Sequence, residues 1–240
     1  MSVRLDRLLA NLGYGSRREV QDLIARGAVT LDGLRLRDPS DHLAPSPDLP
    51  DRMTVAGAPV DPPPPLTLIV NKPLGVVCSH RETGRSVYEL LPHRWRHRTP
   101  VLSTIGRLDA DTSGLLLMTD DGDLLHRVIS PRRHVRKTYL ATLESDLRGD
   151  EGPLFASGSV MLDGETKPLA PATLEPVEMR VARLAVTEGR YHQVRRMFAA
   201  THNLVTGLHR ESIGALVLPA DLSAGAWRIA AAEDIARIFA

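Results

Sequence analysis

Residues 106–118 read GRLDADTSGLLLM, a polar loop bounded by glycines that runs into an apolar stretch. Gly114–Met118 is typical of a short buried strand, so the loop is expected at the edge of a rigid sheet. Loops held by such a scaffold often carry functional residues. Asp109 and Asp111 could act there as acid and base. A polar turn with capping carboxylates explains the same residues, and the composition of the loop leaves both interpretations open.

Strand and helix patterns follow one another irregularly around this loop. Spaced apolar residues predict helices over Leu124–Ile129 and around Val194–Phe198. Short apolar runs predict strands at 66–70, 138–143, 181–187, 204–208 and 216–218. There is no regular strand–helix–strand rhythm, so the expected fold class is α+β with a mixed, mostly antiparallel sheet.

The first 43 residues have the pattern of a separate small module. Four leucines at helical spacing predict a helix that ends at Gly13 and Gly15. Ser16 and Glu19 match a capping box at the start of a second helix that ends at Gly27. Asp32-Gly33 between short apolar runs predicts a hairpin. The module is therefore expected to be helix, helix, hairpin.

A proline-rich stretch follows this module. Residues 44–65 contain eight prolines and are expected to form a linker, with 55–60 completing a strand of the small module. We therefore predict two domains, residues 1–62 with the linker included and residues 63–240.

Composition and charge exclude several classes of protein. The chain has 240 residues with 42% hydrophobic and 25% charged content, which is typical of a globular protein. Cys78 is the only cysteine, so an intramolecular disulfide is excluded, and a structural thiol is the favoured interpretation of this residue. No secretory leader or membrane span is recognisable, and the expected location is the cytoplasm. The sequence has no metal-ligand motif and no Walker or dinucleotide loop.

The net charge of +1 says little about nucleic-acid binding, but the local distribution of charge is informative. Arg17 and Arg18 fall in the first turn of the second predicted helix, where cations oppose the helix dipole and where a phosphate could bind. Two solvated surface arginines explain the same pattern. Residues 126–139 hold five basic side chains and no acid. This stretch could bind phosphates, or it could simply be a solvated face.

Five ordered blocks of sequence resemble the ribosomal RNA pseudouridine synthases that carry an N-terminal alpha-L RNA-binding domain. The resemblance covers essentially the whole chain. The blocks are Asn71-Lys72-Pro73 with Gly75, residues 106–115, Ser130-Pro131 with Lys137-Thr138-Tyr139, residues 188–197, and Leu208-His209-Arg210 with Ile213-Gly214. Residues 1–43 resemble the alpha-L domain. Within the family, residues 190–193 and 208–211 are most similar to the branch that acts on small-subunit (16S) ribosomal RNA.

The resemblance implies a set of catalytic residues. Asp109 corresponds to the aspartate that starts glycosidic cleavage as a nucleophile or base, a role that suits a carboxylate. Tyr139 corresponds to the active-site tyrosine that stacks on the target base. Arg195 stands at the basic position that pairs with the catalytic aspartate, where arginine offers a donor geometry different from that of lysine. Without the motif, Tyr139 would be interpreted as a core residue.

The resemblance also implies residues that bind the RNA. Leu208 would close the uracil pocket, although an ordinary core leucine fits the same position. Arg107 would enter the space left by an extruded nucleotide. Phosphate contacts are expected from basic residues of both domains, namely Arg17, Arg18, Arg132, Arg133, Arg136 and Lys137.

The implied activity is the isomerisation of one uridine of 16S ribosomal RNA to pseudouridine, at the uridine 516 site, as a step of ribosome biogenesis. No cofactor or metal is implied. The partner would be 16S ribosomal RNA or a small-subunit assembly intermediate, and the protein is expected to be a monomer. Two alternatives remain at this point. One is a synthase for 23S ribosomal RNA, and the other is a non-catalytic RNA-binding assembly factor.

Overall fold

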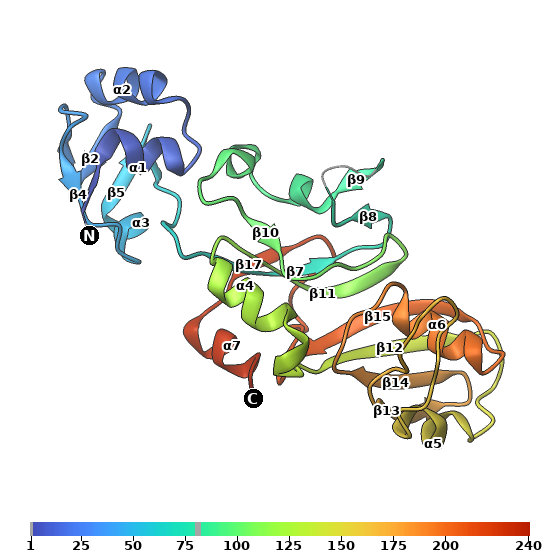
Figure 1. Cartoon of the computed structure of the whole chain (residues 1–240). Coiled ribbons are helices and arrows are strands. Elements are labelled where there is room, and N and C mark those ends of the chain that lie inside the picture. The colour runs from blue at the N-terminus through green and yellow to red at the C-terminus, as the bar shows by residue number, and fades with distance from the viewer. Residues whose placement is uncertain (1, 80–82) are drawn as a thin grey trace. The chain divides into compact units, whose positions relative to one another are not determined.

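Figure 1 shows the computed structural model of the chain, which describes residues 2–79 and 83–240. The chain divides into two compact units. Unit 1 contains the chain up to Thr67 and two later segments, Leu91–Ser103 and Thr119–Gly122. Unit 2 contains Leu68–Leu90, Thr104–Met118 and Asp123–Ala240.

Unit 1 begins with the predicted helix, helix and hairpin. Helix α1 (Leu5–Asn11) buries its leucine stripe, and α2 (Arg17–Ala25) begins at Ser16 with the predicted capping box. Strands β2 (Val29–Leu31) and β3 (Leu34–Arg35) form the hairpin. Its turn residues have positive φ angles of 49° and 79°, as a type I′ turn requires. A short strand pair, β1 (Val3–Arg4) with β4 (His42–Leu43), completes this part.

Much of the proline-rich stretch is folded into unit 1, so the linker interpretation is wrong there. Helix α3 (Leu49–Arg52) and strands β5 (Met53–Val55) and β6 (Ala58–Pro59) follow one another, and the side chains of Leu49 and Met53 lie in the core. Residues 55–60 are not one strand, because Ala56 and Gly57 turn the chain with φ angles of 52° and 83°. The apolar residues between the prolines supply the burial that a linker lacks.

Residues far along the sequence also belong to unit 1. The short helix η2 (His93–His97) packs its backbone closely against Gly13, where a side chain would collide with the carbonyl of Arg94. The Arg94 guanidinium donates to Asp61 at 2.6 Å. The backbone N–H of Thr99 donates to Asn11 O at 2.8 Å.

Unit 2 is built on a nine-stranded sheet with the order β13-β14-β12-β15-β11-β7-β17, to which β10 and β16 add at β11 and β15. Strands β11 and β15 pair in parallel, whereas β12–β14, β12–β15, β13–β14, β15–β16 and β7–β17 are antiparallel. The predicted mixed, mostly antiparallel sheet is therefore confirmed. The strands are β7 (Thr67–Lys72), β10 (Ser103–Thr104), β11 (Thr112–Thr119), β12 (Lys137–Leu143), β13 (Thr173–Glu178), β14 (Val181–Val186), β15 (Val205–Ile213), β16 (Leu216–Val217) and β17 (Trp227–Ile229).

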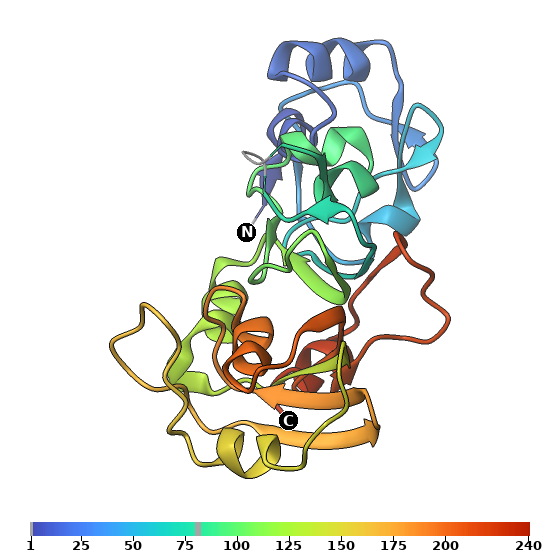
Figure 2. The ribbon, with the colours of Figure 1, turned by 90° about the vertical axis from the view of Figure 1, so that its right-hand side faces the viewer.

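Helices cover this sheet in two groups (Figures 1 and 2). Helices α5 (Glu151–Ala156) and α6 (Gln193–Ala200) pack on β12, β14 and β15, where Phe155 and Phe198 meet edge to face with ring centroids 5.5 Å apart. Helices α4 (Gly122–Ile129) and α7 (Ala232–Arg237) form a second core with β11. The remaining elements are β8 (Val76–Val77), β9 (Arg85–Ser86), η1 (Val87–Leu90) and η3 (Pro131–Arg133). No helix in the described part of the chain is both long enough and apolar enough to cross a membrane.

The pairing of β11 with β15 fixes the place of the loop at 106–111. Thr112 lies opposite Leu208, and Gly114 lies opposite Arg210. A Cβ at Gly114 would approach Arg210 N to 2.7 Å, so only glycine permits this close contact between the strands. The loop therefore emerges beside β15. The other neighbour of β15 in the sheet is β12, the strand that carries Tyr139.

Candidate active site

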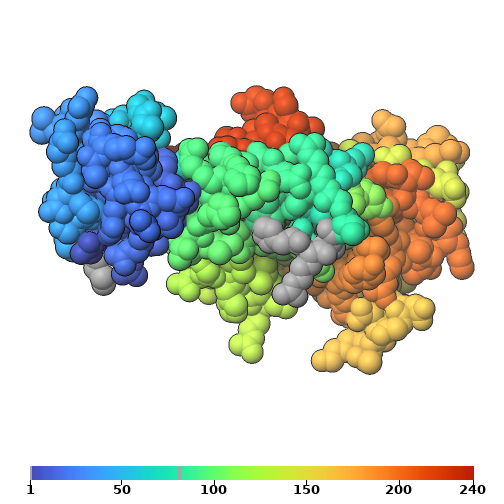
Figure 3. Space-filling view, turned by 90° about the horizontal axis from the view of Figure 1, so that it is seen from above, coloured from blue at the N-terminus to red at the C-terminus, as the bar shows by residue number. Residues whose placement is uncertain are grey.

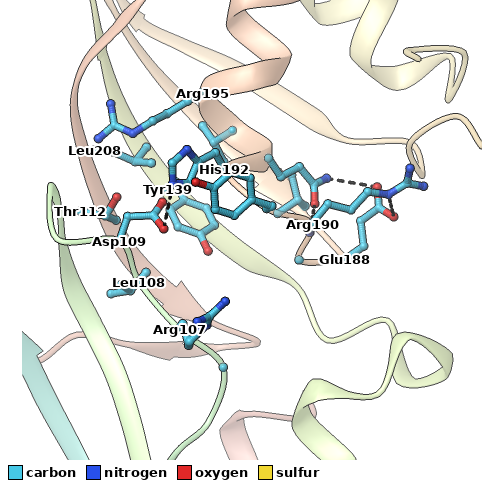
Figure 4. A pocket seen from close by; sticks show the side chains of 16 residues that line it. Arg107, Leu108, Asp109, Thr112, Tyr139, Glu188, Arg190, His192, Arg195 and Leu208 are labelled. Atoms are coloured by element: carbon cyan, nitrogen blue, oxygen red, sulfur yellow. Dashed lines mark hydrogen bonds and ion pairs between the residues drawn. The ribbon is translucent and has the colours of Figure 1, made fainter. Parts of the chain in front are cut away.

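A cavity of about 300 Å³ in unit 2 collects the side chains that the motifs predict. Figure 4 shows that Asp109, Tyr139, Arg195 and Leu208 all line it, and Arg107 lies at one side. The cavity is bordered by the loop before β11, the strands β12 and β15, and the segment from the end of β14 into α6. Its volume is at the lower end of the range for small-ligand pockets.

Asp109 presents a partly exposed carboxylate to this cavity. The turn that holds it is closed by a hydrogen bond from Thr112 N to Asp109 O at 3.0 Å. Its Oδ1 lies 3.4 Å from His192 Nε2, and 37% of the side chain is accessible. The carboxylate is therefore reachable by a molecule in the cavity, and its backbone is fixed by the start of β11.

His192 reaches Asp109 through an unusual backbone conformation. It precedes α6 with φ 47° and ψ 35°, in the left-handed region that few residues other than glycine adopt. The chain before it is anchored by Gln193, whose Oε1 accepts from Arg190 N at 3.0 Å and whose Nε2 donates to Glu188 at 3.1 Å. His192 belongs to a sequence block that resembles the family, but hydrophobic periodicity gives no sign of this conformation, and no role was expected for this residue.

Arg195 lies in the cavity wall but does not pair with Asp109 as expected. Its Nη2 contacts the Asp111 carboxylate at 2.9 Å and donates to Asp111 O at 3.0 Å. Its Nη1 donates to Val205 O at 2.8 Å. The guanidinium thus joins the loop to the start of β15. The expected pairing of Arg195 with Asp109 is therefore wrong. Asp109 and Asp111 lie only two residues apart, and the turn decides which of the two carboxylates faces the guanidinium.

Tyr139 and Leu208 line the cavity from neighbouring strands of the sheet. The Tyr139 hydroxyl accepts a hydrogen bond from Arg210 Nη1 at 3.3 Å. Arg210 is buried and also donates from Nε to Leu115 O at 2.7 Å. This arginine joins β11, β12 and β15 beneath the cavity, so the position of the tyrosine is fixed by the sheet.

Two further polar groups lie under the loop. Lys72 is fully buried, and its Nζ donates to Thr112 O at 2.8 Å and to Pro73 O at 3.0 Å. Burial lowers the pKa of Lys72 against the attraction of Cys78, Asp109 and Asp111. Cys78 is buried, accepts from Leu108 N at 3.5 Å, and has its pKa raised by burial. This environment agrees with the structural thiol that the sequence favoured.

The residues expected to bind phosphates are not equally available. Arg17 and Arg18 are both exposed at the start of α2, but Arg17 also donates at 3.4 Å to the buried carboxylate of Asp6. Hydrogen bonds from Arg4, with Gln21 and Arg17 adding to them, hold the pKa of Asp6 well below its usual range against the opposing effect of burial.

In unit 2 the arginines of the basic stretch are exposed but its lysine is not. Arg132, Arg133 and Arg136 face solvent. Lys137 is half-buried and donates to Val135 O at 3.1 Å, and burial lowers its pKa. Arg132, Arg133 and Arg136 therefore remain accessible to RNA.

The donor set does not suggest a resident metal ion. Within residues 2–79 and 83–240, no group of three histidine, cysteine, aspartate or glutamate side chains is placed to hold one.

Comparisons with known proteins agree with this architecture. Residues 67–200 match the RNA pseudouridylate synthase family, and residues 3–46 match the S4 domain. The chain belongs to the RNA pseudouridylate synthase family, and the predicted class of enzyme is confirmed.

Full-length relatives fall in the same family. The chain is 42% identical to the ribosomal small subunit pseudouridine synthase A of Escherichia coli, over 98% of this chain and 100% of the relative. It is 38% identical to an uncharacterized RNA pseudouridine synthase of Bacillus subtilis, over 97% of both chains. A solved structure described as a crystal structure of pseudouridylate synthase is 34% identical and has a TM-score of 0.69, covering 99% of this chain and 100% of its own.

Proposed function

We propose that this pseudouridine synthase modifies one uridine of 16S ribosomal RNA, at the uridine 516 site, with Asp109 starting the reaction. The observation that carries the catalytic assignment is the Asp109 carboxylate in a cavity that Tyr139 and Leu208 also line. The choice of RNA is supported by the full-length similarity to proteins named small subunit pseudouridine synthase A.

The chemistry breaks the bond between N1 of uracil and C1′ of ribose and forms a bond between C5 and C1′. Asp109 either attacks C1′ as a nucleophile and is expelled when the bond to C5 forms, or removes a proton to start cleavage and returns it later. The base rotates while it remains in the cavity, C5 loses its proton, and N1 gains one. C5 replaces N1 in the bond to C1′ with no net oxidation or reduction, so no redox cofactor takes part.

The other cavity residues hold the base during this rotation. The ring of Tyr139 offers a stacking face, and Leu208 closes the apolar side. The target nucleotide has to leave its helix, at a cost of a few kcal/mol. Arg107, at the side of the cavity, offsets part of this cost when its guanidinium plane stacks in the vacated space.

Basic side chains in each unit supply the phosphate contacts. Arg18 with Arg17 serves in unit 1, and Arg132, Arg133, Arg136 and Lys137 serve in unit 2. Arg17 is exposed but paired with Asp6, so we expect Arg18 and the three exposed arginines of unit 2 to contribute most of the salt-dependent affinity. We propose a monomer that acts in the cytoplasm on 16S ribosomal RNA or on a small-subunit assembly intermediate, with a domain boundary near residue 62.

Substituting Asp109 tests the catalytic assignment. Asp109→Asn keeps the shape of the side chain but removes the carboxylate, so we expect tritium release from uridine-5-labelled 16S RNA to fall below detection. RNA affinity in a filter-binding assay is expected to stay within about twofold, since phosphate contacts supply most of it. Asp221→Asn, a change at an exposed carboxylate outside the cavity, is the matched control and keeps full activity. Turnover by Asp109→Asn in a clean preparation would refute the assignment.

The target is tested by mapping pseudouridines with carbodiimide-dependent reverse-transcription stops in a strain that lacks the protein. We expect one stop to disappear, at position 516 of 16S RNA, and to return when the wild-type chain is supplied. A missing stop elsewhere in 16S RNA would overturn the position alone. A missing stop in 23S RNA would overturn the small-subunit assignment but not the class of enzyme.

A further inference from the structure

One aromatic side chain stands at the rim of the cavity with most of its surface open to solvent. Tyr191 is 70% exposed and is the only aromatic residue among the large hydrophobic side chains that the described residues expose. It nevertheless contributes to the wall of the cavity that holds Asp109. The segment that contains α6, orange in Figure 3, reaches the molecular surface.

The Tyr191 ring is held in a defined orientation despite its exposure. It stacks on the His192 ring with centroids 3.8 Å apart and an interplanar angle of 17°. The backbone is fixed as well, because Arg196 Nη1 donates to Tyr191 O at 3.2 Å. One face of the tyrosine is covered by histidine and the other is open, so the ring is preorganised to receive a second flat group.

The position of this stack relates it to the target base. His192 lies between Tyr191 and the catalytic carboxylate, with Nε2 3.4 Å from Asp109 Oδ1 (Figure 4). The cavity itself is small, and its inner walls are formed by Tyr139 and Leu208. A nucleotide next in the chain to one bound there has to pass over the rim. Unpaired bases in single-stranded RNA bind by stacking on exposed aromatic rings.

We propose that Tyr191, supported by His192, is a stacking subsite for an unpaired nucleobase adjacent to the target uridine. The inference rests on the proposed function, since it assigns a second base-binding surface to the same site. Stacking uses the face of a base and not its edge, so the subsite would accept any base and add affinity without selecting a sequence. Tyr191 is in this role a binding residue, and His192 is its positioning residue.

The test compares substitutions at Tyr191 in the full chain, using steady-state tritium release from uridine-5-labelled 16S RNA. Loss of a base stack costs roughly tenfold in affinity, so Tyr191→Ala is expected to raise KM about tenfold and leave kcat within about twofold. Tyr191→Phe and Tyr191→Trp keep a flat ring and should restore the wild-type KM. Tyr191→Leu is apolar but not flat, and should resemble Tyr191→Ala. The salt dependence of KM should not change, because the side chain carries no charge.

Met179→Ala is the control, since Met179 is 71% exposed, apolar and outside the cavity wall. It should leave both kinetic constants unchanged. A fall in kcat with KM unchanged would mean that Tyr191 only positions His192 beside Asp109, and would overturn the subsite. Recovery by Leu, or failure of Phe to rescue, would also overturn it. If the wild-type chain releases no tritium from any ribosomal RNA, the proposed function fails instead, which keeps the two failures distinct.

Discussion

The contacts of Arg195 assign this residue a structural task at the loop before β11. Its guanidinium holds the carboxylate and carbonyl oxygens of Asp111 and also the carbonyl of Val205. The loop before β11 is thereby attached to the start of β15. Asp109 lies within that attached loop, so we expect Arg195 to act on the proposed catalytic carboxylate by fixing the backbone that carries it.

A double-mutant cycle on kcat tests this assignment. Asp111→Asn and Arg195→Met should each slow tritium release, because either change releases one end of the loop contact. The double variant should lose less than the sum, with a coupling free energy of about 0.5–3 kcal/mol. Additive effects would instead show that Arg195 acts on Asp109 without Asp111, as the sequence alone suggested.

The sequence identified the members of this site better than their contacts. Asp109, Tyr139 and Leu208 were found through motifs, and all three line the cavity. The sequence could not show which carboxylate Arg195 contacts, because Asp109 and Asp111 lie close together and both are far from Arg195 along the chain. The contact of His192 with Asp109 depends on a left-handed backbone that no hydrophobic pattern encodes.

At the scale of elements, strands β11 and β15 approach each other closely at Gly114. Its φ angle is 106°, and a side chain there would collide with the backbone of Arg210. Strands β11 and β15 carry the two halves of the site, namely the loop with Asp109 and the wall with Leu208. Separating the strands would therefore disturb the fold and the cavity together.

Gly114→Ala should destabilise the protein by about 3 kcal/mol or more, because backbone strain and overpacking add. Gly164→Ala is the matched control. Gly164 also has a positive φ, 75°, but nothing lies within 4 Å of its missing side chain, so we expect a loss of about 1 kcal/mol from strain alone. The free energies of unfolding come from urea titration of the full chain. Equal losses at the two glycines would contradict the role given to the strand contact.

Strands with continuous or alternating apolar residues were predicted well, and other elements were not. The strands at β7, β11, β12 and β14 follow from their composition. Strand β13 was missed because most of its side chains are exposed and it carries Pro176. Helix α3 was hidden among prolines, and only its contacts with the rest of unit 1 explain why it folds.

At the scale of the whole molecule, the border between the units depends on segments that return from far along the chain. Arg98 donates to Pro62 O at 2.8 Å and forms a buried ion pair with Asp120 at 3.3 Å. Arg94 binds Asp61. Local composition places a boundary near residue 62 but cannot show that later segments pack against the residues before it. Separating the chain there would take the Pro62 carbonyl away from Arg98 and the Asp61 carboxylate away from Arg94, and both losses are destabilising.

Unit 1 and unit 2 should contribute separable parts of the activity, and Arg18 tests the part assigned to unit 1. Arg17 is unsuitable for this test, since its substitution would also disturb the buried carboxylate of Asp6. Arg18 is exposed. Each phosphate contact contributes about one unit to the slope of log Kd against log salt. We expect Arg18→Gln to weaken binding of 16S RNA and to reduce the slope of log Kd against log salt by about one. At saturating RNA, kcat should be unchanged, because the cavity in unit 2 is intact.

Arg52→Gln provides the matched control for this measurement. Arg52 is an exposed arginine of the same unit, but its guanidinium is paired with Asp32 at 2.7 Å and with Asp48 at 3.5 Å. Its charge is already balanced by these carboxylates, so removing it should leave the salt slope nearly unchanged. If both substitutions lower the slope equally, the effect is one of overall charge. If neither does, the start of α2 does not contact phosphate, and the affinity has to come from the arginines of unit 2.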